Sequence, residues 1–174
     1  MFRSIWRFVC LMLMWCGQLM AGHSNSLMDI SGDGKLLACS NRDSGSVTFV
    51  DLTTRKVTHE IPVGRHPEGV SFIGATHNLA VAVHADDTVV LLDGDQGKEL
   101  ARASVFDEPY GVVSTRDGKH LYVTLDFPGQ VIEIDSGTRQ ITRQWDAGKF
   151  TRGLALCPDE SRIYITEYYT GIVR

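Results

Sequence analysis

Short apolar runs separated by tight turns fill the chain from residue 27 onward, and they recur at a constant interval. Many runs are rich in β-branched and aromatic residues, which is typical of strands. We expect second strands at 36–39, 79–82, 121–124 and 163–166, third strands at 47–51, 89–93 and 131–135, and more polar fourth strands at 56–63, 98–105 and 139–145. The interval is marked by Gly69, Gly111 and Gly153 and by Asp51, Asp93 and Asp135, at steps of 42 residues (69 to 111 to 153).

A fixed period of about 40 residues built from short strands and turns is typical of a β-propeller blade. The more polar fourth strand of each repeat fits an outer edge that faces solvent. We therefore predict an all-β fold, a β-propeller fragment of about three and a half four-stranded antiparallel blades within residues 23–174. The blades are predicted to start near Leu27, Val70, Val112 and Leu154. Because propellers close with about four to eight blades, we expect the N-terminal part of a longer protein.

Several recurring side chains have a structural explanation. The repeated aspartates after the third strands are expected to fix the following turn by side-chain to backbone bonding. Three aromatic residues, Phe49, Phe72 and Trp145, are expected to pack between blades, and His59, His77 and His120 are expected on the solvated surface.

Residues 1–22 differ in kind from the repeats. Arg3 and Arg7 precede the apolar stretch 8–16, and the small residues Ala21 and Gly22 follow. This order is typical of a secretory signal peptide, with an uncleaved anchor as the alternative. We expect an exported protein, periplasmic, cell-surface or extracellular, with no membrane span after signal cleavage.

Composition narrows the function classes. The chain has 174 residues, 43% hydrophobic and 22% charged, with a formal net charge of −4. An acidic excess argues against a nucleic-acid partner, which would need a broad basic surface. Cys39 and Cys157 are expected to be buried free thiols that pack as small hydrophobic residues, and the sequence contains no Cys-x-x-Cys-His motif.

A family resemblance rests on four segments: 33–36, 61–69, 117–124 and 131–135. They resemble the YVTN-type β-propeller repeat over essentially all of residues 27–174. The chain departs from that repeat where its asparagine should close the second strand, at Ser40, Val83, Leu125 and Glu167. The resemblance extends to the haem-binding propellers of cytochrome-type nitrite reductases and to lactonase-like propellers.

Two sets of loops, before the first strand and after the second strand of each blade, are expected at the same end, around the mouth of the central channel. Loops on a rigid scaffold commonly carry function. The mouth could ligate a metal or haem iron through histidine or clamp an anionic ligand with Arg42 and Arg152. The candidate ligand-binding residues are His66, His84, Tyr110, Asp126, Arg152 and Tyr168.

We expect an exported scaffold that binds an unknown small molecule or protein at the mouth, with no resident cofactor and no catalytic residue. No nucleophile motif or phosphate-binding glycine loop is found. The resemblance implies two alternatives. In a haem-associated redox propeller, His66 or His84 would ligate the iron. A lactonase-like hydrolase would use His84 together with Arg152.

Overall fold

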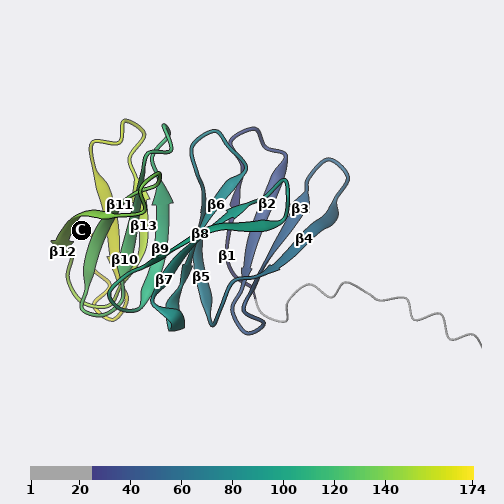
Figure 1. Cartoon of the computed structure of the whole chain (residues 1–174). Coiled ribbons are helices and arrows are strands. Elements are labelled where there is room, and N and C mark those ends of the chain that lie inside the picture. Colours follow the sequence, from purple (N-terminus) through teal and green to yellow (C-terminus); the bar gives the residue numbers. More distant parts are fainter. Residues whose placement is uncertain (1–24) are drawn as a thin grey trace, which may run out of the picture.

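The computed structural model describes residues 25–174, so the predicted signal peptide lies outside the described residues. Its 14 strands form three four-stranded sheets and one two-stranded sheet, side by side in chain order (Figure 1). Blade 1 contains β1 (Asn25–Ile30), β2 (Leu36–Asn41), β3 (Ser46–Asp51) and β4 (Lys56–Pro62). Blade 2 contains β5 (Pro67–Phe72), β6 (Asn78–Val83), a short 3₁₀ turn η1 (His84–Asp86), β7 (Thr88–Asp93) and β8 (Lys98–Ser104). Blade 3 contains β9 (Pro109–Ser114), β10 (His120–Leu125), β11 (Gln130–Asp135) and β12 (Ile141–Asp146), and the fourth sheet pairs β13 (Thr151–Leu156) with β14 (Ile163–Glu167).

This arrangement confirms the predicted all-β propeller fragment. All pairings within the sheets are antiparallel, and the innermost strands β1, β5, β9 and β13 neighbour one another from blade to blade. The first strands begin two or three residues earlier than predicted, at Asn25, Pro67, Pro109 and Thr151. No helix among residues 25–174 is both long and apolar enough to cross a membrane.

The core lies between the faces of neighbouring blades. Phe49 of blade 1 and Phe72 of blade 2 are buried and meet edge to face, with ring centroids 6.4 Å apart. Their predicted packing between blades is therefore confirmed. Strands β6 and β7 are buried on both faces, which explains their continuous apolar runs. Trp145 differs, because it is 42% exposed on the polar outer strand β12.

The repeated aspartates fix the turns as predicted. Asp51 accepts the backbone N–H groups of Thr53 (2.8 Å) and Thr54 (2.7 Å). Asp93 and Asp135 accept the equivalent pairs in the next two blades. These hydrogen bonds lower the pKa of Asp51 and Asp135, with the bonds from Thr54 and Thr138 as the largest causes. They are turn residues in separate blades rather than a shared carboxylate site.

Blade 1 corrects one detail of the repeat alignment. Asn41 pairs with Ser46 at the end of β2, as Val83 pairs with Thr88 and Leu125 with Gln130. The residue that closes the second strand is therefore Asn41, and not Ser40. Its side-chain amide donates to Ser46 Oγ (3.1 Å) and to Thr48 Oγ1 (2.8 Å).

Candidate functional site

A β-bulge interrupts every described first strand at the same repeat position. In β5 the register jumps from Pro67 opposite Val83 to Val70 opposite Val81, which leaves an extra residue on β5. The jump recurs in β9 and β13. A bulge re-aims side chains and is common beside functional sites. The bulges contain Glu68 with Gly69, Tyr110 with Gly111, and Arg152 with Gly153.

The residue just before each of these strands adopts the left-handed backbone conformation. Its carbonyl accepts the N–H of the first residue after the second strand of the same blade. Each blade thereby ties its two mouth loops together. The pairs are His66 (φ 52°) with His84 at 3.0 Å, Glu108 (φ 44°) with Asp126 at 2.8 Å, and Phe150 (φ 51°) with Tyr168 at 3.0 Å.

Side chains from neighbouring blades then meet in pairs, always from the same two repeat positions. One partner follows the second strand of one blade, and the other lies in the bulge of the next blade. We call these residues, together with Tyr168, the mouth ring. The pairs are Arg42 with Glu68, His84 with Tyr110, and Asp126 with Arg152.

Arg152 is the centre of the last pair. Its Nη2 and Nε donate to Asp126 Oδ2 at 3.0 and 3.2 Å. The guanidinium carbon lies 4.7 Å from the ring centroid of Tyr110 and 3.9 Å from that of Tyr168, which adds cation–π attraction. Although partial burial opposes its charge, the hydrogen bond and negative charge of Asp126 raise the pKa of Arg152.

The middle pair is aromatic. His84 meets Tyr110 edge to face with ring centroids 6.1 Å apart. Burial, followed by the negative charge of Glu68, raises the pKa of Tyr110. His84 Nε2 also lies 4.0 Å from Asp126 Oδ2. The structure thus joins five of the six predicted site residues into one network: His84, Tyr110, Asp126, Arg152 and Tyr168.

The His66 side chain makes none of these side-chain contacts and lies at the seam between blades 1 and 2, although its carbonyl accepts the N–H of His84. Arg42 Nε donates to the buried Glu68 Oε1 at 2.7 Å, and Arg42 Nη2 lies 3.4 Å from His66 Nδ1. Arg42 and His66 border a hollow of about 450 Å³ that continues to Arg65 and Ala85. Because Arg42 and Arg152 are each paired with a carboxylate, they do not form the free anion clamp that the sequence suggested.

Two acidic residues, Glu68 and Glu108, belong to loops expected at the mouth but are not among the candidate binding residues that the sequence suggested. Glu68 is the partner of Arg42, and Glu108 joins His84 and Asp126 in a group whose potential metal-ligating atoms lie within 4.8 Å of one another. Both positions lie 42 residues from a candidate already chosen, since Glu68 precedes Tyr110 by that interval and Glu108 follows His66 by it.

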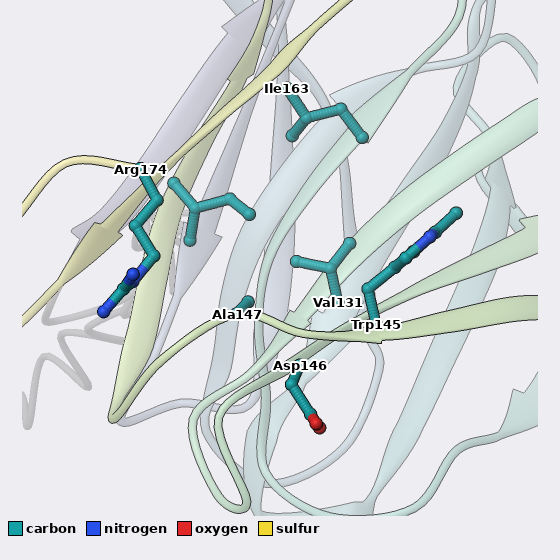
Figure 2. Close-up of a pocket in the computed structure, with 7 residues that line it drawn as sticks. Val131, Trp145, Asp146, Ala147, Ile163 and Arg174 are labelled. Atoms are coloured by element: carbon teal, nitrogen blue, oxygen red, sulfur yellow. The ribbon is translucent and has the colours of Figure 1, made fainter.

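An apolar hollow of about 300 Å³ lies away from the mouth ring, between blade 3 and the two-stranded sheet (Figure 2). Val131 and Trp145 line it from blade 3, and Ile163 and Ile165 line it from β14. Arg174 closes one side, with its backbone paired to Ile165 by two hydrogen bonds of 2.9 and 3.0 Å. Trp145 thus lies at a seam between blades, although it is half exposed.

Fold and site together define a β-propeller fragment with a ring of varied polar and aromatic side chains at one end of its inner strands. No family model matches the chain, so the YVTN-type assignment stays a prediction. Antigen Lp49 of Leptospira interrogans is 27% identical over 168 residues, which covers 83% of this chain and 36% of that protein. A chain of hydrazine synthase from Kuenenia stuttgartiensis superposes with a TM-score of 0.72 and 27% identity, over 84% of this chain and 46% of that chain. This chain therefore spans less than half the length of either similar protein.

Proposed function

We propose that this chain is part of an exported propeller scaffold that binds a protein segment at the mouth ring. The proposal rests on the varied chemistry of the three side-chain pairs that connect neighbouring blades in the mouth ring. The same two repeat positions hold a cation with a carboxylate, an imidazole with a phenol, and a carboxylate with a cation. By contrast, the second bulge position keeps one residue type in β5, β9 and β13, where it is Gly69, Gly111 and Gly153.

Exposed aromatic side chains at the same end favour a protein partner over a small polar molecule. Tyr168 is 58% exposed, Tyr169 is 70% exposed, and their ring centroids lie 4.9 Å apart. Phe150 packs on Tyr169 at 4.8 Å, and Arg152 lies over Tyr168. Tyrosine and arginine are enriched among the residues that dominate binding energy at protein interfaces. Exposed aromatic patches of this kind commonly mark interaction sites.

Export is supported by the signal-like first 22 residues and by the similarity to a protein named as an antigen. The test is to fuse residues 1–22 to a reporter enzyme that is active only outside the cytoplasm. Reporter activity that is lost when Arg3 and Arg7 are changed to glutamate supports export. An inactive reporter fusion that is recovered intact from the cytoplasm contradicts it.

The two alternatives find less support in the geometry. His84 shares its surroundings with the carboxylates of Glu108 and Asp126. A porphyrin already fills four positions around its iron, so a cluster of three protein ligands is a poor match to haem. The side chains of the hydrolase pair, His84 and Arg152, are connected through Asp126 and Tyr110, which both approach.

A peptide-display selection against the immobilised chain, followed by affinity measurements on a selected peptide, tests the binding function. We expect Tyr168→Ala and Tyr169→Ala each to weaken binding by about tenfold or more, as for residues that dominate an interface. Tyr164→Ala is the matched control, because Tyr164 is 45% exposed and is the second residue of β14, whose last residue, Glu167, precedes Tyr168. Equal affinities for all three variants would overturn the site.

The same purified protein separates the alternatives. A haem absorption band that disappears in His84→Ala would favour the redox propeller. Lactone hydrolysis that disappears when His84 and Arg152 are both changed to alanine would favour the hydrolase.

A further inference from the structure

The group formed by His84, Glu108 and Asp126 offers one imidazole nitrogen and two carboxylate oxygens within 4.8 Å of one another. Asp126 is the buried member, with its side chain 5% exposed. Arg152 occupies its Oδ2, whereas its buried Oδ1 has no hydrogen-bond partner among residues 25–174. A buried carboxylate oxygen without a donor is costly, and a bound cation would supply the missing partner.

The backbone holds the three residues in place before any ion arrives. Asp87, one residue after the η1 turn that begins at His84, accepts the N–H of Glu108 at 3.0 Å. The carbonyl of Glu108 accepts the N–H of Asp126 at 2.8 Å. Two blades are thus clamped together around the group. Such preorganisation is what a ligand set needs in order to hold an ion without a large ordering cost.

The equivalent positions at the neighbouring seams lack this chemistry. Between blades 1 and 2 they are Arg42, His66 and His84, in which a guanidinium replaces a ligand. At the following seam they are Asp126, Phe150 and Tyr168. Of the seams in the described part of the chain, the one between blades 2 and 3 alone combines three residues of ligand type.

We propose that His84, Glu108 and Asp126 form a binding site for one divalent transition-metal ion of the Zn²⁺ class. Mixed imidazole and carboxylate donors favour such ions, whereas Ca²⁺ and Mg²⁺ take oxygen ligands. Tetrahedral Zn²⁺ with bonds of about 2.1 Å sets its donors about 3.4 Å apart, so the group closes by about 1.4 Å at most. The partly exposed Glu108 supplies that movement by side-chain rotation, and the fourth position stays open to water.

The test is calorimetric titration of Zn²⁺ into the full-length chain after chelator treatment and dialysis. We expect one saturable site whose affinity falls about tenfold or more in His84→Ala and in Glu108→Gln. Asp126→Asn also breaks the ion pair with Arg152, so Glu108→Gln is the decisive variant. Its melting temperature without metal should match that of the unaltered chain. Zn²⁺ should protect the unaltered chain against thermal unfolding and should not protect Glu108→Gln.

Two controls exclude other origins of the signal. His77 also faces two carboxylates, Asp33 and Asp95, but both of its ring nitrogens are engaged by them, so His77→Gln should keep full Zn²⁺ affinity. Substitution of Co²⁺ should give an absorption spectrum without thiolate charge transfer, which excludes the cysteines. Affinity that is unchanged in Glu108→Gln, or equally reduced in His77→Gln, would overturn the site. Because only metal is titrated, this outcome is independent of whether a protein segment binds the mouth ring.

Discussion

Close backbone approach between inner strands makes Gly69→Ala the sharpest test of the fold. A Cβ added at Gly69 would lie 2.5 Å from the carbonyl oxygen of Tyr110, 2.8 Å from the amide nitrogen of Val112 and 2.9 Å from the Cα of Gly111. All three atoms belong to the backbone of β9, so no side-chain rotation relieves the overlap. The two inner strands must separate by about 0.5 Å or more to restore a normal contact.

The expected cost follows from overpacking a closely packed interior, about 1–3 kcal/mol. Alanine recovers about 0.4–1 kcal/mol by restricting the unfolded chain. Taking the middle of both ranges, we expect a net loss of about 1–2 kcal/mol in the free energy of unfolding. For a chain of this size, that corresponds to a fall of about 2–8 °C in melting temperature.

Thermal unfolding followed by circular dichroism, with Gly137→Ala as the control, measures the effect. The nearest atom to a Cβ at Gly137 is Asp135 Oδ1, at an ordinary 3.5 Å. This control should melt at or slightly above the temperature of the unaltered chain. If both variants melt within about one degree of each other, the reasoning about inner-strand contact is refuted.

The remaining predictions concern single contacts. Hydrogen bonding to Asp95 and then to Asp33 raises the pKa of His77 above its ordinary value of 6.5. The resulting stabilisation is fully present below that value and is lost as pH rises through the folded pKa, so His77→Gln should destabilise more at about pH 5.5 than at about pH 9 in urea titrations. Thr124→Val removes the acceptor of a buried inner-strand N–H (2.8 Å) and should cost about 1–3 kcal/mol by the same assay. Phe49→Ala removes a fully buried ring between blades and should cost about 3–5 kcal/mol, against near zero for the exposed Phe127→Ala.

Much of the fold could be predicted from local signals in the sequence. The turn aspartates and the apolar strands are each visible within one short segment, and their recurrence every 42 residues indicates how many blades the segments form. The alignment of the repeats is wrong by one residue in blade 1. Leu27 and Met28 are both apolar, so the hydrophobic pattern does not show which of them is equivalent to Val70. A slip of one residue exchanges the two faces of a strand, which is why Ser40 was assigned the place of Asn41. The bulges also escaped prediction, because an extra residue leaves no mark in composition.

The sequence predicted which loops carry the site residues, but it did not predict which side chains contact one another. The sequence places Asp126 and Arg152 in loops of different blades, yet their ion pair depends on how two blades pack face to face. His77 shows the same limit. The sequence places it at the solvated surface, where it is partly exposed, but it does not indicate the bonds to Asp95 at 2.6 Å and to Asp33 of blade 1 at 3.2 Å. Contacts between residues 44 positions apart, as between His77 and Asp33, follow from tertiary packing and not from local pattern.

Each bulge has one residue position at which only glycine fits and one at which the side chain can vary. Its second residue, Gly69 or Gly111, presses against the neighbouring inner strand, so a side chain there is excluded by backbone contact. Its first residue, Glu68 or Tyr110, projects to the mouth, where the backbone ties of the loops do not depend on side-chain identity. Chemistry at the mouth can therefore change from blade to blade without disturbing the scaffold. A metal-ligating group at one seam and an aromatic cluster at the next are compatible outcomes of the same backbone.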